Sequence, residues 1–205
     1  MKKADYRESI RSIAEQREIL HLLHFTQFSN LREIVKHGLL SRDKLAGPEY
    51  MAYAIDRFRL DGNGEAVSVS ISRVNERMFA AKRYRSGHAD WVLLVLPSEI
   101  LWTHNCLFSW RNAAKKEVRD HRGWRRGPWA FSKMFEGSVA DRNDLPMHYP
   151  TDPEAEVQVL ESISPDLILG AVVFRPEMVD KVQACLEGLP GAKRLVVFDE
   201  DTGER

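Results

Sequence analysis

The stretch His24-Phe25-Thr26-Gln27-Phe28-Ser29-Asn30-Leu31, closed by His37-Gly38-Leu39, indicates the end of a strand, a capped helix and a glycine stop. Ser29 can cap the first N–H groups of this helix with its side-chain oxygen, and Gly38 can adopt the left-handed conformation that ends it. This layout presents His24 and nearby backbone groups to a ligand. From these residues alone, a core histidine bonded to a backbone carbonyl is the simpler interpretation of His24.

Apolar patterns along the rest of the chain predict a sheet with helices between its strands. Strands are expected over residues 66–72, 91–96, 155–161, 167–174 and 195–198, and helices over 75–85 and 176–187. A basic, helical segment is expected after Pro97 up to about residue 135, and a loop with little structure over 42–64. Residues 5–20 carry a thin apolar stripe among many charges, which predicts a helix that packs on the domain. Strands and helices neither alternate strictly nor segregate, so the expected fold class is α+β.

The composition allows one substantial core and gives no support to several other classes of protein. The 205 residues are 43% hydrophobic, and 30 Lys and Arg balance 30 Asp and Glu, so net charge alone does not indicate a nucleic-acid partner. Cys106 and Cys185 lie far apart and no His-Glu-x-x-His spacing occurs, so neither a disulfide framework nor a metal site is expected. No segment approaches the roughly 20 apolar residues that cross a bilayer, and we expect a cytoplasmic chain without a membrane segment. No Gly-x-Gly-x-x-Gly follows a predicted strand, so a Rossmann dinucleotide site is not supported.

Basic and aromatic side chains are interleaved between Trp110 and Lys133, although the chain as a whole is neutral. Cations follow phosphates while flat side chains stack on unpaired bases, so this mixture suits single-stranded nucleic acid better than duplex DNA. The alternative is a solvated basic helix followed by a loop that tryptophan side chains hold in place. The candidate nucleic-acid-binding residues are Arg111, Lys115, Arg122, Trp124, Arg125, Arg126 and Trp129.

Glu156 lies in a segment whose alternation places Glu154, Glu156 and Gln158 on one face of a strand. Apolar residues occupy the other face of the same segment. Taken alone, the pattern is that of an edge strand whose polar side faces solvent.

Four stretches of the chain form an ordered set of motifs. From residue 24 to 39 the chain carries His-Phe-Thr-x-x-x-Asn-Leu-x-x-Ile-x-x-x-Gly-Leu. It continues with Asn75-x-x-Met78-Phe79, Leu107-Phe108-x-x-Arg111-Asn112-Ala113-Ala114 and Glu154-Ala155-Glu156-Val157. The first stretch is similar to the N-terminal motif, and the others to later segments, of the DarT-type DNA ADP-ribosyltransferases, a toxin family with an ADP-ribosyltransferase fold. The resemblance runs from about residue 22 to residue 175.

This resemblance implies a single mixed domain over residues 1–205, with a central split β-sheet of ADP-ribosyltransferase type and flanking helices. The family begins close to the strand that carries the histidine, so an extra N-terminal helical appendage over residues 1–20 departs from its pattern. A packing helix is the simpler interpretation of this appendage, and a partner-binding or regulatory element is the other.

The resemblance also implies NAD as the consumed ADP-ribose donor and gives each candidate residue a role. Glu156 matches the catalytic glutamate, whose carboxylate can stabilise a cation-like ribose or take a proton from the acceptor. The second catalytic residue is an arginine within residues 54–62, for which we choose Arg59, with Arg57 as a close rival. The expected NAD-binding residues are His24, Thr26, Asn30, Gly38, Leu39, Arg57, Met78 and Phe79, the last two as an apolar wall against nicotinamide.

A member of this family would transfer ADP-ribose to a base in single-stranded DNA and act as a growth-inhibiting toxin that a macrodomain antitoxin partner reverses. Glu154 stands where the family has Gln, and that position can help to orient the catalytic base. A second hypothesis keeps the chemistry and moves the acceptor to RNA, in antiviral defence. A third is a nucleic-acid-binding module whose NAD site is catalytically degenerate.

Overall fold

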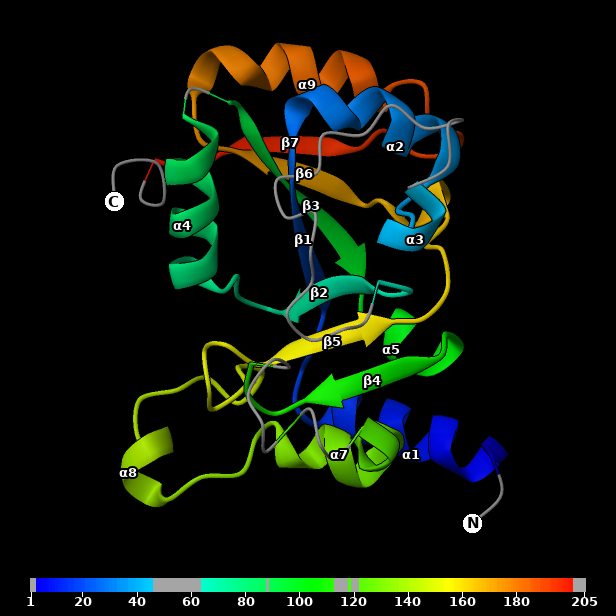
Figure 1. Ribbon diagram of the computed structural model, residues 1–205, viewed down its shortest axis with the longest axis vertical. Coiled ribbons are helices and arrows are strands. Elements are labelled where there is room, and N and C mark those ends of the chain that lie inside the picture. The colour runs from blue at the N-terminus through cyan, green and yellow to red at the C-terminus, as the bar shows by residue number, and fades with distance from the viewer. Residues whose placement is uncertain (1–2, 46–63, 88, 113–117, 119–121, 201–205) are drawn as a thin grey trace.

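A seven-stranded sheet forms the centre of the computed structural model (Figure 1), which describes residues 3–45, 64–87, 89–112, 118 and 122–200. The strands are β1 (His21–Gln27), β2 (Val67–Ile71), β3 (Trp91–Pro97), β4 (Cys106–Ser109), β5 (Glu156–Val159), β6 (Gly170–Val173) and β7 (Leu195–Phe198). They lie in the order β4-β5-β2-β1-β3-β6-β7. Neighbouring strands are antiparallel except β6 and β7, which are parallel.

The sheet opens between β1 and β2. These strands pair only through Leu22 with Ile71 and Leu23 with Ser70, whereas β1 pairs with β3 along its whole length. β2 continues beyond this point in pairing with β5. The ring of His24 lies across the opening, with its Nδ1 2.9 Å from the carbonyl oxygen of Ser68. The sheet is therefore split, and the expected α+β fold of a single mixed domain is confirmed.

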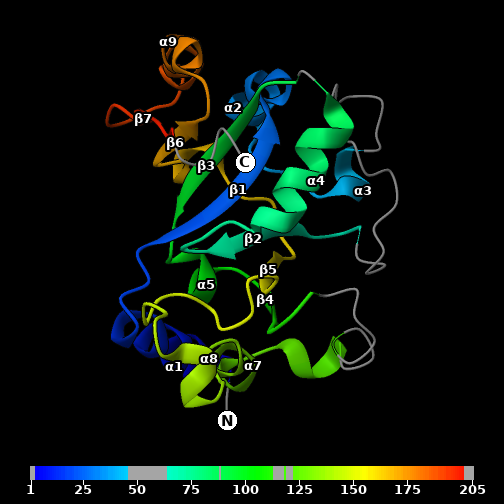
Figure 2. The same cartoon turned by 90° about the vertical axis from the view of Figure 1, so that its left-hand side faces the viewer.

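Helices lie at both ends of the molecule (Figures 1 and 2). The α-helices are α1 (Lys3–Gln16), α2 (Leu31–His37), α3 (Arg42–Leu45), α4 (Glu76–Ser86), α5 (Ile100–Thr103), α7 (Pro128–Lys133), α8 (Val139–Arg142) and α9 (Val179–Leu186). The 3₁₀ turns are η1 (Phe28–Asn30), η2 (Arg122–Arg125), η3 (Pro165–Leu167) and η4 (Pro176–Met178). At one end α2 contacts α9, and at the other α1 contacts α5 and α7.

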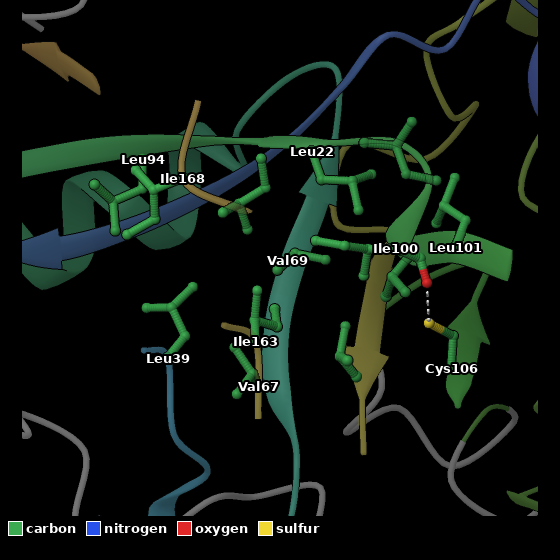
Figure 3. Close-up of a cluster of buried hydrophobic side chains, with 14 of the residues drawn as sticks. Leu22, Leu39, Val67, Val69, Leu94, Ile100, Leu101, Cys106, Ile163 and Ile168 are labelled. Carbon is green, nitrogen blue, oxygen red and sulfur yellow. Dashed lines mark hydrogen bonds between the residues drawn. The ribbon is translucent and has the colours of Figure 1, made fainter. Parts of the chain in front are cut away.

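One face of the sheet carries the main hydrophobic core (Figure 3). Leu22, Leu94 and Ile163 are fully buried in it. Val157 and Val159 of β5 belong to the same core and are also fully buried. Alternate residues of a strand point to opposite faces, so the residues between these valines point away from the core. On β5, the core therefore lies on one face, and Glu156 and Gln158 lie on the other.

The opening motif forms a strand, a 3₁₀ turn and a helix, but its cap differs from the prediction. η1 precedes α2, so Asn30 occupies the position before α2, and its side chain makes no capping hydrogen bond. The expected cap, Ser29, instead donates from Oγ to Oε1 of Gln27 (3.5 Å). Gly38 ends α2 as predicted, with a φ of 80°, and a Cβ there would lie 2.2 Å from the carbonyl oxygen of Ile163.

The middle segment departs most from the sequence prediction. Instead of a helical segment up to residue 135, the chain forms α5, then β4, and later η2 and α7. Periodicity does not predict β4, because a short apolar run looks the same in a buried strand and a buried helix. Pairing with β5 decides between them. The predicted strand over 167–174 is shorter as well, since residues 165–167 form η3.

Membrane and metal features were sought in the part of the chain that the structure describes. There, no helix is both long enough and apolar enough to cross a membrane. No group of three or more His, Cys, Asp and Glu side chains in that part could hold a metal ion.

Candidate active site

Glu156 is the first residue of β5 and lies opposite Ser109 of β4, on the face away from the main core. Glu156 is half-buried, whereas Ser109 is fully buried and its hydroxyl finds no hydrogen-bond partner among the described residues. Gln158 is fully buried on the same face and accepts a hydrogen bond from Nη2 of Arg125. β5 lies between β4 and β2, so the interpretation as a solvent-facing edge strand is wrong. The polar face of β5 is an interior surface with a partly accessible carboxylate at its start.

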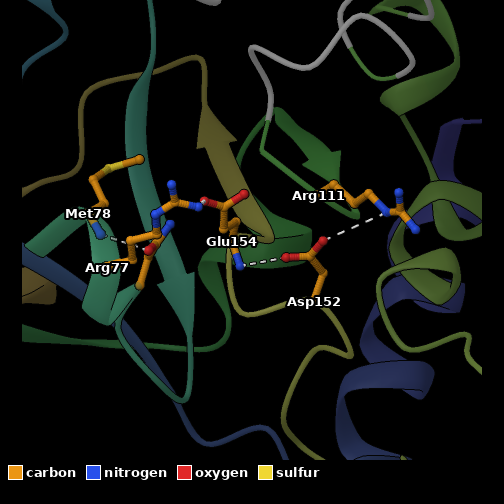
Figure 4. A network of polar contacts seen from close by, with 6 residues as sticks. Arg77, Met78, Arg111, Asp152 and Glu154 are labelled. Carbon is orange, nitrogen blue, oxygen red and sulfur yellow. Dashed lines mark hydrogen bonds and ion pairs between the residues drawn. The ribbon is translucent and has the colours of Figure 1, made fainter. Parts of the chain in front are cut away.

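Ion pairs fix the turn that leads into β5 (Figure 4). Nη1 of Arg77, in α4, lies 3.6 Å from Oε1 of Glu154, and Nε of Arg111 lies 3.7 Å from Oδ2 of Asp152. The backbone N–H of Glu154 donates to Oδ1 of Asp152 (2.8 Å). Both arginine side chains are exposed, so the ion pairs add little to the free energy of unfolding. Their effect is to orient the turn.

Arginines also hold the loop before this turn by donating to backbone carbonyl groups. Arg142 of α8 donates from Nη1 to the carbonyl of Tyr149 (3.0 Å) and to Oγ1 of Thr151 (2.9 Å). Arg73, which follows β2, donates from Nη2 to the carbonyl of Pro150 (2.8 Å) and lies over the Tyr149 ring. Burial disfavours the charged form and lowers the pKa of Arg73. The chain therefore enters β5 from a loop that two separate elements hold.

The predicted NAD-binding residues of the opening motif lie together where β1 and β2 separate. The carbonyl of Ser68 can only accept, so Nδ1 of His24 carries the proton of the neutral ring and Nε2 is the acceptor. Nδ2 of Asn30 donates to Oγ1 of Thr26 (3.3 Å), a side chain that is almost fully buried. His24 and Thr26 point to the same face of β1. The hydrogen bond to the Ser68 carbonyl agrees with the interpretation of His24 as a histidine bonded to a backbone carbonyl. The same bond fixes the ring beside the opening.

Leu39 does not offer the expected backbone groups to a ligand. Its N–H donates to the carbonyl of Ile163 (2.9 Å), and its own carbonyl accepts from the N–H of Ile163 (3.0 Å). The N–H of Gly38 donates to the carbonyl of Ile34 (2.8 Å). The prediction for Leu39 is wrong because an isolated antiparallel bridge with Ile163 uses both of its backbone groups.

Phe79 belongs to an interior aromatic cluster rather than to a ligand wall, so this prediction is also wrong. Its ring centroid lies 5.2 Å from that of Phe25, 5.7 Å from that of Trp91 and 5.0 Å from that of Phe174. Such contacts are typical of a packed core. Met78 is half-buried and remains available, with its N–H bonded to the capping side chain of Asn75.

A groove of about 890 Å³ lies beside the turn into β5, and tryptophan side chains form much of its lining. The Trp129 ring meets the rings of Trp110 and Trp124 nearly edge to face, at centroid distances of 5.8 Å and 6.2 Å. Trp124 is 69% exposed and Trp129 is 51% exposed. The lining comprises Trp110, Arg111, Trp124, Trp129, Lys133, Glu136, Gly137, Asp141, Thr151, Asp152 and Pro153. Large exposed indole faces of this kind can stack on unpaired bases.

Charges within the groove nearly balance. Two cations, Arg111 and Lys133, face three carboxylates, Glu136, Asp141 and Asp152. Hydrogen bonds from the side chain and backbone of Ser138 lower the pKa of Asp141 and keep it ionised. The groove therefore does not attract phosphate groups by charge, and its indole faces suit an uncharged ring.

The predicted nucleic-acid-binding residues separate into three groups. Arg111, Trp124 and Trp129 line the groove, and Arg126 is exposed nearby in sequence. Arg125 is wrong as a surface contact, because it is 2% exposed and turns inward to Gln158. Lys115 lies outside the described residues, and the structure does not describe the side chain of Arg122. The two arginines predicted for catalysis and NAD binding, Arg57 and Arg59, also lie outside the described residues.

The sequence does not predict several residues of this site. Ser109 has no local signal, because β4 itself is not predicted, and Arg77 reaches Glu154 only through the fold. Asp152 does have a signal. An Asp whose side chain accepts from the N–H two residues later is a common turn, and Asp152-Pro153-Glu154 has that form.

Comparisons with known proteins agree with this geometry. The sequence model of the family described as "ssDNA thymidine ADP-ribosyltransferase, DarT" matches residues 23–201. Among solved structures, Thermus sp. 2.9 DarT in complex with NAD+ matches with a TM-score of 0.59 and 15% identity, over 90% of this chain and 98% of that chain. The same Thermus protein in complex with ADP-ribosylated ssDNA matches with a TM-score of 0.61 and 16% identity, over 90% and 96%.

A third structure, Thermosipho africanus DarTG in complex with ADP-ribose, matches with a TM-score of 0.57 and 13% identity, over 90% of this chain and 51% of that one. At these identities the structural matches support the fold, and the family rests on the sequence model. None of the curated proteins compared with the chain matches it in sequence.

Proposed function

The chain belongs to the DarT family of ssDNA thymidine ADP-ribosyltransferases, and from this premise we propose that Glu156 is its catalytic carboxylate and the tryptophan-lined groove its contact with DNA. The protein is an NAD-dependent enzyme that modifies single-stranded DNA. The position of Glu156 supports the proposal most strongly. A half-buried carboxylate starts β5, opposite a buried hydroxyl and close to the turn that borders the groove.

The reaction requires one carboxylate in that position. The bond between the nicotinamide nitrogen and C1′ of the ribose breaks, and nicotinamide leaves as a neutral molecule. A nucleophilic atom of the base forms the new bond to C1′. Glu156 stabilises the positive charge that develops on the ribose and takes the proton that the base loses. Glu156 can serve both purposes because it is only half-buried.

Residues at the opening of the sheet fit NAD as the donor. His24 presents a fixed ring there, and Thr26 and Asn30 add a hydroxyl and an amide within one turn of chain. These groups can hydrogen-bond the hydroxyls and ring nitrogens of a nucleotide. Arg59, with Arg57 as its rival, is proposed to bind the pyrophosphate as a permanently charged planar fork.

The groove suits a base of the DNA strand rather than its phosphates. Lys133 lies 5.4 Å and 5.1 Å from the centres of the Trp110 and Trp129 rings, which holds these rings in place and leaves the Trp124 face exposed. Arg126 is exposed and is not part of the groove lining, so we propose that it binds phosphate groups of the DNA strand. RNA offers the same stacking faces, so the experiment below includes RNA of the corresponding sequence.

The toxin role, the reversal by a macrodomain antitoxin and the cytoplasmic location are part of this proposal. They derive from the family resemblance, and the name DarTG of the Thermosipho africanus protein is consistent with a paired antitoxin. Expression of the chain in a bacterium should stop growth, and co-expression of a macrodomain hydrolase should restore it.

One experiment tests the enzymatic part directly. The protein is incubated with NAD and a short thymidine-containing DNA oligonucleotide, or with RNA of the corresponding sequence, and the products are weighed by mass spectrometry. We expect a DNA adduct heavier by one ADP-ribose, with none for Glu156→Gln. An adduct on RNA alone would move the acceptor to RNA. Hydrolysis of NAD without any adduct would contradict the proposed transfer.

A further inference from the structure

The N-terminal helix α1 lies outside the residues that the family matches, which begin at residue 23. It is nevertheless built into the molecule. Ile10 and Ala14 of α1 are buried, and the helix contacts α5 and α7 (Figures 1 and 2). Two residues of α7, Trp129 and Lys133, line the groove. The helix therefore lies at the groove end of the molecule, away from α2 and α9.

α1 lies beside one wall of the groove, the wall formed by Trp129 and Lys133 of α7, through Tyr6. The Tyr6 ring lies against Gly127, where an added Cβ would approach the ring to 3.1 Å. Gly127 has a φ of 84° and is the residue before α7. Trp129 and Lys133, which line the groove, both belong to α7. Tyr6 therefore lies directly beside the start of α7.

The other wall of the groove includes residues 151–153. Arg17, which directly follows α1, contacts the loop that leads to this wall. The Arg17 guanidinium lies 4.2 Å from the centre of the Phe135 ring, and its Nη1 donates to the carbonyl of Met147 (3.3 Å). Met147 belongs to the loop that Arg142 and Arg73 also hold, and this loop continues through the wall residues 151–153 to Glu156. Burial lowers the pKa of Arg17, and the nearby charge of Arg142 lowers it further, as expected where two cations converge on one loop.

We propose that α1 positions the DNA-binding groove, and that Arg17 is a positioning residue that holds the loop between α8 and β5 for the DNA strand. The inference rests on the proposed role of the groove. Without the bond to Met147, Arg142 and Arg73 still hold the loop at residues 149–151, but the part around Met147 gains conformational freedom. DNA binding must then remove this freedom, which lowers affinity. NAD does not require the bond, because the residues proposed for it belong to the opening of the sheet.

The test compares Arg17→Met with Arg11→Met in the full chain. Methionine keeps an apolar stem against Phe135 and removes the donor. Arg11 lies on the same helix, is exposed, and forms an ion pair with Glu15 one turn away, so it is the matched control. We expect Arg17→Met to weaken binding of a fluorescent DNA oligonucleotide by about 3- to 10-fold, the range for one lost hydrogen bond. NAD affinity and kcat at saturating DNA should stay unchanged, and Arg17→Lys should restore part of the DNA affinity.

Two results would overturn the inference. One is a DNA affinity of Arg17→Met equal to that of Arg11→Met. The other is an equal loss of NAD and DNA affinity, which would indicate a general defect of folding. If Arg17→Met does not fold, Arg17→Lys is compared with Arg11→Lys, and a DNA affinity of Arg17→Lys equal to that of Arg11→Lys would then overturn the inference. Trp124→Ala separates this inference from the proposed function. An unchanged DNA affinity in that variant would reject the groove itself, whereas a loss there without a loss in Arg17→Met would reject only the role of α1.

Discussion

Nη2 of Arg125 donates a hydrogen bond to Oε1 of Gln158 inside the protein, on the same face of β5 as Glu156. Arg125 belongs to η2, and its neighbours in sequence, Trp124 and Arg126, are exposed. The bond therefore ties the segment that lines the groove to the strand with the proposed catalytic carboxylate. A buried guanidinium that loses an acceptor is costly, so this link should be rigid.

Arg125→Met and Arg126→Met should separate stability from DNA binding. Arg125→Met removes a buried hydrogen bond to Gln158 and should lower the free energy of unfolding by about 1 to 3 kcal/mol. Arg126→Met should change it by less than about 0.5 kcal/mol. It should instead weaken oligonucleotide binding and reduce the slope of log affinity against log salt by about 0.7, the value for one phosphate contact on a single strand. Urea unfolding measures the free energy of unfolding. Fluorescence anisotropy at several salt concentrations measures the oligonucleotide affinity and its dependence on salt.

Equal unfolding curves for these two variants would contradict the interior position of Arg125. An unchanged salt slope in Arg126→Met would place the phosphate contacts on other residues.

Glu156→Gln should reduce transfer of ADP-ribose by at least ~100-fold, the scale for loss of a general base. The amide keeps the shape of the side chain, so thermal stability and NAD affinity should be unchanged. Glu154→Gln is the matched control, since it makes the same change of carboxylate to amide and introduces the residue that the family has at this position, and the ion pair that it removes is with an exposed arginine, Arg77. Rates are measured by mass spectrometry of the oligonucleotide. A loss in Glu154→Gln as large as that in Glu156→Gln would show that the assignment between the two glutamates is wrong.

The sequence predicts the features of this fold that depend on local pattern. The long apolar run of β3 and the glycine at residue 38 follow from local pattern and turn chemistry within a few residues, and Asn75 caps α4 where the expected helix begins. Each of these signals is strong because it is local. The family resemblance, and not a local pattern, identifies Glu156, since alternating glutamates are typical of exposed strands.

What the sequence does not predict depends on contacts between distant segments. Arg125 and Arg126 are adjacent basic residues, and only the pairing of β4 with β5 decides that the first turns inward to Gln158. Leu39 likewise forms an antiparallel bridge with Ile163, a residue far along the chain, and this bridge uses its backbone N–H and carbonyl groups. Tertiary contacts of this kind leave no mark on local composition.

Cys106 and Cys185 should differ in their reaction with iodoacetamide. Burial raises the pKa of the Cys106 thiol to about 12, and its Sγ donates to the carbonyl of Ile100 (3.5 Å; Figure 3). Only the thiolate reacts, so at pH 8 about 1 in 10⁴ of the Cys106 thiols would be reactive. Cys185 is half-buried and should be alkylated in the native protein. Peptide mass spectrometry with and without urea checks this, and rapid native labelling of Cys106 would contradict the burial of β4.

Gly38→Ala should be far more destabilising than Gly87→Ala. Both glycines have positive φ, 80° and 61°, so both substitutions carry the strain of that conformation, about 1 to 2 kcal/mol. At Gly87 a Cβ would meet no described atom within 4 Å, whereas at Gly38 it would lie 2.2 Å from the carbonyl oxygen of Ile163. Relief of that clash must break the bridge between Leu39 and Ile163, so we expect an additional loss of at least ~2 kcal/mol in urea unfolding. Equal losses would show that the bridge is not rigid.

Trp124→Ala should weaken binding of a single-stranded oligonucleotide, because Trp124 offers the most exposed indole face of the groove, at 69%. Loss of one stacked base is worth about 1 to 3 kcal/mol of binding free energy. Little packing is lost with an exposed ring, so the melting temperature should hardly change. Tyr84→Ala is the control, because Tyr84 is an exposed aromatic residue on α4 that does not line the groove, and it should leave both quantities unchanged.

Trp129 lies between two other indoles at 5.8 Å and 6.2 Å, so Trp129→Ala should lower both DNA affinity and melting temperature. A fall in melting temperature alone in both tryptophan variants would show that the indoles pack the protein and do not bind DNA.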